Sequence, residues 1–368
     1  ERFEYDPDDH EASWPSELSE VNLPPRGGLE IKVFDDQRRP LPATLRLSTL
    51  ITDESVTPNG FSAHTKGELI HVIEEARVAV AAGRYRYTLT RGFEYEPVYG
   101  ELEVVDGEVI SLEVILRHLN PIDHYLSFDG HVHAGPSPDS DVLIIDRLRG
   151  AAAEGVEIVA GTDHEIITDW ATHLSPKLKP WVTTIIAEES TATLPEHMNI
   201  YPLPAREEVN RGDPPLWYGM GFDRFTEQLA ERGASVIQLN HPRQGCNYLC
   251  LIGYDRETGE PDPSLNSLNF GYDEGEIWGW GFNAVELLND TRPLFIDVDR
   301  PQETGFFEDW ASFINLGHKI TGVGVTDIHG RDGIGAPITL LKLAEGEGEE
   351  ELNPAEVSPE QVAEAVVR

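Results

Sequence analysis

The chain has 368 residues and a formal net charge of −38 at pH 7, because 66 Asp and Glu outnumber 28 Lys and Arg. Nucleic acids and anionic membrane surfaces are bound by clustered Lys and Arg, so this composition excludes a scaffold for either. The length suggests about two domains, and a hydrophobic content of 39% is enough for packed cores. No apolar run reaches the ~18 residues that can cross a bilayer, so we expect no membrane span.

The basic residues are mostly Arg, with only 6 Lys among the 28. An acidic, Lys-poor surface is typical of a salt-tolerant protein or of one outside the cytoplasm. The chain opens at Glu1 without an initiator Met, as a processed chain would. We therefore favour a periplasmic or secreted location over a cytoplasmic one. Cys246 and Cys250 are too few for a disulfide framework, and we interpret them as two ordinary thiols.

Residues 1–26 are acidic and contain several Pro residues, which predicts an irregular lead-in. From residue 27 to 118, short segments alternate apolar and polar side chains between turns, which is the pattern of β-strands. These segments are 29–33, 44–47, 85–90, 101–105 and 109–116. Because no helical stretch interrupts them, they predict a small β-sandwich. Within it, His64 and His71 are isolated and are expected to be ordinary surface residues.

From residue 119 to 343 the pattern changes to strands followed by helices, which is typical of an α/β barrel or a doubly wound sheet. The expected strands are 126–128, 156–160, 181–186, 235–239, 284–288 and 320–325. An insertion at 244–282 is rich in Gly, Asp and aromatic residues, and we favour a substrate lid over a packing flap there. Residues 344–368 predict an acidic linker and a short helix with Ser358 and Gln361 in a capping box.

Five clusters of His and carboxylate residues directly follow expected strands. This is the position at which α/β barrels build their active sites. In the segment 131–133, two histidines at i and i+2 of an extended chain face the same side, so both can reach one metal ion. The other clusters contain His164, Glu189 with His197, His241, and Asp327 with His329. One such histidine is usually an ordinary loop or core residue, but five clusters in the same position predict a metal centre.

In type, order and spacing these motifs resemble the PHP (polymerase and histidinol phosphatase) superfamily of metal-dependent phosphoesterases, and more narrowly its CehA/McbA family of metallohydrolases. The matching segments are DGHVHAGPSPDS (129–140), AAEGVEIVAGTDHEIITDW (152–170), AEESTATLPEHMNIYPL (187–203), LNHPRQG (239–245) and VGVTDIHG (323–330). The resemblance implies a distorted (βα)7 TIM-like barrel over residues 119–343, holding two or three divalent ions. It also implies that residues 27–118 are the carboxypeptidase-regulatory-like β-sandwich that commonly precedes this barrel.

The family's metal ligands can be carried over to individual residues of this sequence. The resemblance implies one ion on His131, His133, Glu189 and Asp327, a second shared through Glu189 with His197 and His241, and a third on Asp139, His164 and His329. Two departures from the family pattern leave alternatives. The usual glycine before the carboxylate is Ala187, and Glu188 is an alternative bridging ligand. Asp139 lies one residue later than in the common spacing, so two and three ions are both compatible with the sequence.

Imidazoles and carboxylates suit Zn, Mn or Fe. Two such ions bridged by a carboxylate would lower the pKa of a bound water and polarise a P=O or C=O group. The sequence therefore predicts hydrolysis of a small-molecule substrate, either a phosphoester or a carbamate or carboxylic ester. Asp129 and Asp163 adjoin ligand histidines and are candidates to fix their tautomers, with Asp163 an alternative ligand. Arg243 is a candidate to steady an anionic substrate.

Two other interpretations stay open. A non-catalytic surface or periplasmic binding protein would keep metal only for its structure, and a bare structural barrel would contain histidines that merely form hydrogen bonds. The complete set of ligand types favours the hydrolase over both. Only Arg243 and Arg331 are cations near the motifs, which slightly favours a neutral ester or carbamate over a phosphoester.

Overall fold

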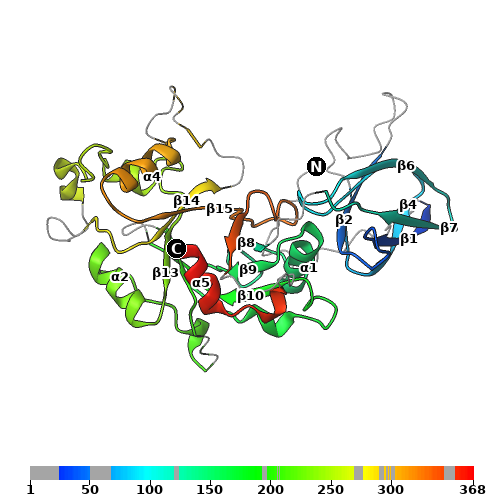
Figure 1. Ribbon diagram of the computed structural model, residues 1–368, viewed down its shortest axis with the longest axis horizontal. Helices are drawn as coiled ribbons and strands as arrows, with labels where there is room; N and C mark the ends of the chain where they lie inside the picture. Colours follow the sequence, from blue (N-terminus) through cyan, green and yellow to red (C-terminus); the bar gives the residue numbers. More distant parts are fainter. Residues whose placement is uncertain are drawn as a thin grey trace, which may run out of the picture.

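The first seven strands form two β-sheets at one end of the molecule (Figure 1). The structure is a computed structural model that describes residues 25–49, 68–119, 124–192, 197–204, 206, 208–268, 277–289, 294–295, 297, 299, 303–343 and 353–368. The seven strands are β1 Arg26–Phe34, β2 Ala43–Thr49, β3 Glu68–Val72, β4 Glu75–Ala81, β5 Gly83–Thr90, β6 Val98–Val104 and β7 Val109–Ile115. One sheet has the order β4-β1-β7, and the other has the order β3-β2-β5-β6.

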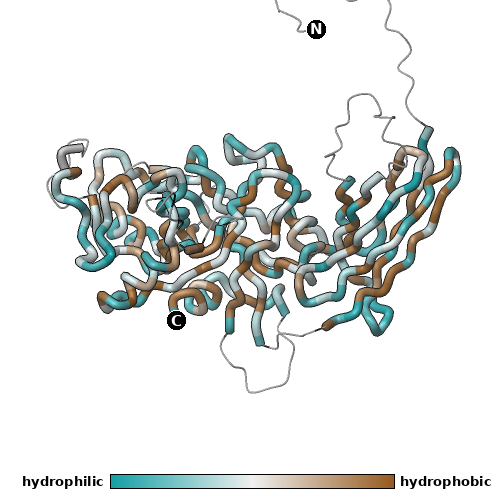
Figure 2. The backbone as a smooth tube through the Cα atoms, turned by 90° about the horizontal axis from the view of Figure 1, so that it is seen from above, coloured by the Kyte–Doolittle hydropathy of each residue, from teal (hydrophilic) through white to brown (hydrophobic). Residues whose placement is uncertain are grey.

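The two sheets enclose a hydrophobic core of their own. In β1 alternate residues are buried, and Leu29, Ile31 and Val33 are each at most 1% exposed. The tube in Figure 2 shows hydrophilic and hydrophobic segments on the strands at this end of the molecule. The expected alternation in β1 is therefore confirmed. We call residues 26–115 the β region.

The rest of the described chain, within residues 124–368, contains both strands and helices, and we call it the α/β region. Its strands are β8 Tyr125–Val132, β9 Ile158–Gly161, β10 Thr183–Ile186, β11 Glu188–Thr191, β12 His197–Tyr201, β13 Val236–Leu239, β14 Ala284–Asn289, β15 Thr321–Val325 and β16 Thr339–Lys342. Its α-helices are α1 Ile144–Glu154, α2 Phe222–Glu231, α3 Tyr248–Leu251, α4 Phe306–Asn315 and α5 Pro359–Val367. Short 3₁₀ helices lie at Trp170–His173, Asn210–Gly212, Pro263–Leu268 and Pro354–Glu356.

The strands of the α/β region form two sheets, with the orders β10-β9-β8-β16 and β11-β12-β13-β14-β15. Parallel bridges between Val132 and Ile328 and between His164 and Glu189 join the two sheets. Strand β12 runs antiparallel to both of its neighbours, and the described residues contain only five α-helices. The prediction of a mixed α/β fold is confirmed, but a complete (βα)7 barrel is not shown.

Helices α2 and α4 pack into the larger core of the α/β region, and α5 packs into a second core beside β13 and β16 (Figure 1). Ser358 and Gln361 form the expected capping box at the start of α5, because each side chain bonds the other residue's backbone N–H. None of the described helices is both long and apolar enough to cross a membrane.

The aromatic residues of the 244–282 insertion pack into a core. Tyr248, Tyr254 and Trp278 are each at most 6% exposed and belong to the same core as α2 and α4. The expectation of a substrate lid is therefore wrong for these side chains, since burial leaves them no surface to offer a substrate. Phe270 and Tyr272, which the sequence also assigned to the lid, lie outside the described residues.

Cys246 and Cys250 are joined in a disulfide, so the expectation of two ordinary thiols is wrong. A spacing of four residues at the start of a helical turn brings the two sulfurs together. The bridge closes a small loop around Asn247, next to the segment that follows β13.

The β region contacts the α/β region through β2, β3 and α1. Arg46 of β2 donates to both carboxylate oxygens of Asp332 at 2.6 Å and forms an ion pair with Glu154 of α1 at 3.2 Å. His71 of β3 is half-buried between its partner Thr44, with Nδ1 3.2 Å from Oγ1, and α1. The expectation of a surface His71 is wrong because α1 covers it, and His64 lies outside the described residues.

Candidate metal centre

The structure brings all nine predicted ligand side chains together at one edge of the α/β region. They are His131 and His133 at the end of β8, Asp139 before α1, His164 after β9, Glu189 in β11, His197 at the start of β12, His241 after β13, and Asp327 and His329 after β15. Because β12 is reversed, its first residue lies at the edge where the parallel strands end. This explains how His197 joins the group from the opposite end of its strand.

Four donor atoms, three of them on fully buried side chains, form the innermost part of the centre. The Oε2 atom of Glu189 lies 3.2 Å from Nε2 of His131 and 3.3 Å from Nε2 of His133. On the other side, Oδ1 of Asp327 lies 3.3 Å and 3.4 Å from the same two nitrogens. The side chains of His131, His133 and Glu189 are 0% exposed, so this part of the centre is closed to solvent.

Glu189 connects this inner group to a second one through its other oxygen. Its Oε1 atom lies 3.0 Å from Nδ1 of His197 and 3.5 Å from Nε2 of His241. The amide of Asn240 donates to the same oxygen at 2.9 Å. Glu189 thus has one oxygen in each group, which is the arrangement of a bridging carboxylate.

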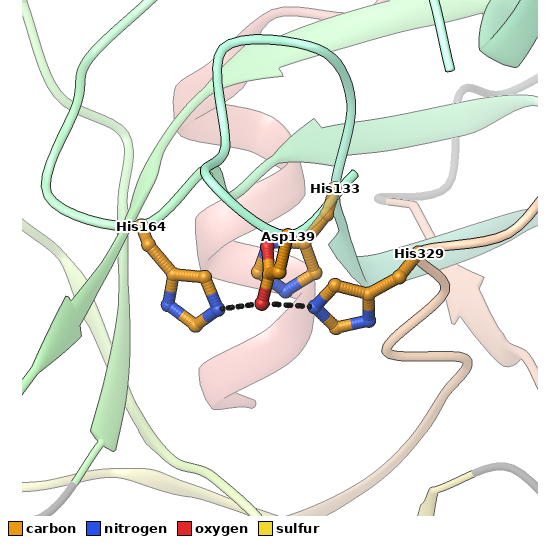
Figure 3. Close-up of side chains that lie close together, drawn as sticks. All are labelled: His133, Asp139, His164 and His329. Carbon is orange, nitrogen blue, oxygen red and sulfur yellow. Dashed lines mark hydrogen bonds and ion pairs between the residues drawn. The ribbon is translucent and has the colours of Figure 1, made fainter. Parts of the chain in front are cut away.

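A third group surrounds Asp139, whose carboxylate lies between His164 and His329 with His133 behind it (Figure 3). The Oδ2 atom of Asp139 is 3.0 Å from Nε2 of each of the two outer histidines. These side chains are more accessible than the inner group: Asp139 is 47% exposed and His329 is 31% exposed. The side of Asp139 is therefore the part of the centre that is most open to solvent.

The carboxylates and imidazoles strongly shift one another's pKa. Burial raises the pKa of Glu189, but the neighbouring imidazoles, above all His131, outweigh burial and hold it well below its usual range. Burial lowers the pKa of His131, but Asp327 and Glu189 raise it well above its usual range. The pKa of His241 is raised to about 9 because Glu189 and Glu286 outweigh its burial. The centre therefore attracts positive charge, whether protons or metal cations.

The structure distinguishes the two adjacent glutamates. Successive residues of a strand point to opposite faces, and Glu189 faces the histidines while Glu188 faces away. Both carboxylate oxygens of Glu188 are buried without a hydrogen-bond partner. Burial and the nearby Glu165 raise the pKa of Glu188 well above its usual range. Glu189 is therefore the bridging candidate, and Glu188 is not placed to compete with it.

The donor atoms fit a metal ion in chemistry and in spacing. The Nε2 atoms of His131 and His133 and the Oε2 atom of Glu189 are buried and make no hydrogen bond, although buried polar groups nearly always have a partner. Four ligands placed tetrahedrally around an ion at ~2.0–2.1 Å are separated by about 3.4 Å. The four separations between an imidazole nitrogen and a carboxylate oxygen of the inner group, 3.2 to 3.4 Å, are close to this value.

Glu286 of β14 contacts His131 and His241 on the side away from the inner group, and none of the sequence motifs includes it. Its Oε1 atom lies 2.5 Å from Nδ1 of His131, the ring nitrogen opposite the one that faces the inner group. Its Oε2 atom accepts the backbone N–H of His241 at 2.7 Å. A carboxylate on the far nitrogen of a ligating histidine fixes its tautomer and orientation. The only sequence signal was an acidic residue within an otherwise apolar strand.

Asp129 and Asp163 hold the backbone of the centre, and their recorded contacts are not with ligand imidazoles. Asp129 accepts from the hydroxyl of Thr326 at 2.6 Å and from the backbone N–H of His131 at 3.3 Å. Asp163 accepts from the backbone of Ala134 at 2.8 Å and from the indole of Trp170 at 3.0 Å. The contact that was expected from Asp129 or Asp163, one that fixes a ligand tautomer, is thus made by Glu286 instead. Burial raises the pKa of Asp129 to about 6 and that of Asp163 to about 7.

Arg243 is 2% exposed and forms a two-pronged ion pair with Asp309 of α4 through Nε and Nη2. Its guanidinium is thereby engaged inside the protein. The expectation that Arg243 steadies an anionic substrate is therefore wrong. Arg211, which the sequence did not single out, is an exposed cation beside the centre, and its Nη2 donates to the backbone carbonyl of His164 at 3.2 Å.

No protein-family model and no curated protein matches the chain. Among solved structures, a two-domain protein of Bacteroides vulgatus that contains a predicted PHP-like metal-dependent phosphoesterase is 17% identical, with a TM-score of 0.42. That match covers 68% of this chain and 65% of the other. PsfC from Pseudomonas syringae is 15% identical with a TM-score of 0.35, over 62% of this chain and 86% of its own. Likenesses this remote assign neither a family nor an activity.

Proposed function

We propose that this chain is a metal-dependent hydrolase of the PHP type, related to the CehA/McbA family, with a centre of two or three divalent ions. The observation that supports it most directly is the inner group of His131, His133, Glu189 and Asp327. The Nε2 atoms of His131 and His133 and the Oε2 atom of Glu189 are buried without a hydrogen-bond partner, and Oδ1 of Asp327 lies 3.3 Å from Nε2 of His131. The His and carboxylate motifs at 129–140, 239–245 and 323–330 support the same function.

The residues of the chain have distinct tasks in this proposal. His131, His133 and Asp327 would hold one ion, His197 and His241 would hold a second, and Glu189 would contribute one oxygen to each. Asp139, His164 and His329 would hold a third ion where three are present. Such ions supply Lewis acidity and a water of lowered pKa when bound. Glu286 keeps the proton of His131 on Nδ1, so that Nε2 is left as the donor atom.

The substrate is an ester, either a phosphoester or a carbamate or carboxylic ester. Burial of Arg243 removes one of the two cations that the sequence placed near the motifs and supports the neutral ester or carbamate. Arg211 supports the phosphoester, because an exposed guanidinium lies next to His164. An R211Q variant separates the two classes: it should raise KM for a phosphoester and leave KM for a carbamate unchanged.

The test uses a panel of p-nitrophenyl phosphate, bis-p-nitrophenyl phosphate and naphthyl carbamate esters, each with Zn, Mn or Fe restored. We expect turnover in one class, and we expect H131A to lose both metal and turnover. H173A is the matched control, because His173 is an exposed histidine outside the centre, and it should keep both. Absence of turnover on every ester by the metal-loaded protein would refute the hydrolase.

We also propose a periplasmic or secreted location. The disulfide between Cys246 and Cys250 supports it, because disulfides persist mainly in oxidising compartments. The acidic, Lys-poor composition points the same way. Fractionation of the native cells with an antibody against this chain tests the proposal, and recovery of the protein in the cytoplasmic fraction would contradict it.

A further inference from the structure

Arg147 of α1 is a fully buried cation beside the candidate metal centre. Its side chain is 2% exposed, and its guanidinium donates to backbone carbonyls of two loops. Nε donates to the carbonyl of His133 at 2.9 Å, and Nη1 donates to that of Gly330 at 2.6 Å. Nη2 donates to the carbonyls of His329 at 3.1 Å and Ile328 at 3.4 Å. A single side chain therefore connects the loop after β8 to the loop after β15.

Five of the nine candidate ligands lie on these two loops or at the end of β8: His131, His133 and Asp139 on one side, and Asp327 and His329 on the other. The backbone already joins them, because the N–H of His133 donates to Ile328 at 3.1 Å and that of Asp327 donates to His131 at 2.9 Å. Among the described residues, an isolated bridge between Val132 and Ile328 takes the place of a continuous ladder between β8 and β15. Arg147 extends this narrow connection to the segment beyond Asp327.

The contacts of Arg147 are unusual for a buried charge. Buried Arg side chains are normally paired with a carboxylate, but the recorded hydrogen bonds of Arg147 all go to carbonyl oxygens. Burial lowers its pKa to about 10, with Asp129 and Asp163 acting only through their charge. Burying the charged guanidinium costs free energy. In this position, however, its rigid planar shape holds the bound carbonyls at a fixed spacing.

We propose that Arg147 is a positioning residue that sets the distance between the two ligand loops and so fixes the affinity of the centre for its ions. This inference rests on the proposed metal-dependent function. A planar guanidinium can span three or four carbonyls at fixed angles, whereas the single ammonium of Lys cannot. Arg147 touches no reacting atom and acts through the backbone of His133 and of residues 328–330.

The experiment compares R147K with R91K. Arg91 is a matched control, because it is also a buried arginine, 7% exposed, that donates to backbone carbonyls, those of Pro42 and Ala152. It lies at the junction with the β region, away from the centre. Two quantities are measured for each variant: Zn affinity by competition with a chromophoric chelator, and hydrogen exchange of residues 327–331 in the metal-free protein.

We expect R147K to lose roughly 10- to 100-fold in Zn affinity, the range found when support of metal ligands is removed, and to exchange faster at residues 327–331. R91K should keep the affinity and exchange rate of the native chain. Equal Zn affinity in R147K and the native chain, or an equal loss in both variants, overturns the inference. Failure of the native chain to bind any metal would instead refute the proposed function.

Ser140→Ala provides a second test if R147K does not fold. The Ser140 hydroxyl donates to the carbonyl of His329 at 2.9 Å, one of the carbonyls that Arg147 also binds. Loss of the Ser140 hydroxyl removes one of the hydrogen bonds to the loop after β15, and it changes the packing little. We expect a several-fold loss of Zn affinity with faster exchange at residues 328–330, and an unchanged affinity would overturn the inference.

Discussion

Glu286 offers the sharpest test of the candidate centre, because all four of its recorded partners donate to it. Oε1 faces Nδ1 of His131 at 2.5 Å and the amide of Gln238 at 3.1 Å. Oε2 faces the backbone N–H of His241 at 2.7 Å and the amide of Asn289 at 2.7 Å. Only a group with two acceptor oxygens satisfies these four donors, so a carboxylate fits and a carboxamide does not.

The E286Q variant keeps the shape of the side chain but replaces one oxygen with an NH2 group. Whichever way the amide turns, two buried donors face another donor. Each buried donor left unsatisfied costs ~1–3 kcal/mol, so we expect the free energy of unfolding to fall by about 2–6 kcal/mol. Support of the His131 ring is also lost, and metal affinity should fall ~10- to 100-fold, equivalent to about 1.4–2.8 kcal/mol.

E157Q is the matched control. Glu157 is another largely buried carboxyl, and it accepts hydrogen bonds from the backbone N–H and the hydroxyl of Ser127. It lies just before β9, at the opposite end of that strand from His164. Metal affinity is measured by chelator competition, and stability by urea unfolding of the metal-free proteins. Native-like metal affinity in E286Q, within about twofold, would refute the reasoning, and so would an equal loss in E157Q.

Three further predictions concern pH and redox state. Metal must displace protons from imidazoles such as His241, whose pKa is raised to about 9. Metal affinity should therefore increase with pH from about 6.5 to 9. Calorimetry in two buffers of different ionisation enthalpy should detect the released protons, and absence of proton release would contradict this prediction. Burial lowers the pKa of His71 from 6.5 to about 4, so its contribution to stability is complete above pH 6.5 and is lost as the pH falls towards 4, on the order of 2 kcal/mol. H71Q should flatten that dependence in denaturant titrations at several pH values, and an unchanged profile contradicts it. Reduction of the disulfide between Cys246 and Cys250 should destabilise the protein by at most about 2 kcal/mol, because the closed loop is short; the same reductant should leave the unfolding of a C246S/C250S variant unchanged.

The residues of the centre could be found from the sequence because their positions follow from strand geometry. A strand places i and i+2 on one side, so His131 and His133 were expected to act together, and the structure shows them facing the same atoms. The ends of parallel strands meet at one edge, which brings in His164 and His241. His197 was placed by resemblance, and the reversed direction of β12 explains its position.

The residues that support the centre could not be found in this way. Glu286 lies 155 positions from His131 in the sequence, and its role depends on which strands are neighbours. Arg147 lies on a helix with apolar neighbours and has the appearance of a solvent-facing charge, although it is buried against the loop after β15. Arg243 followed a ligand motif directly, but its partner Asp309 comes from α4, far away in the sequence. Each role arises from long-range packing, which local patterns do not encode.

The number of ions and the class of substrate are linked through charge. Three candidate ligands are carboxylates, Asp139, Glu189 and Asp327, and Glu286 adds a fourth negative charge in direct contact with His131. Two divalent ions would balance these four charges, leaving a centre that suits a neutral ester or carbamate. Three ions would leave an excess of positive charge at the exposed side of Asp139, which favours an anionic phosphoester. Because the whole protein carries a net charge of −38, a phosphoester would need this local excess to approach. Ion counting by anomalous scattering should therefore agree with the substrate panel: two ions with carbamate turnover, or three with phosphoester turnover. Phosphoester turnover by a two-ion centre would contradict this charge argument.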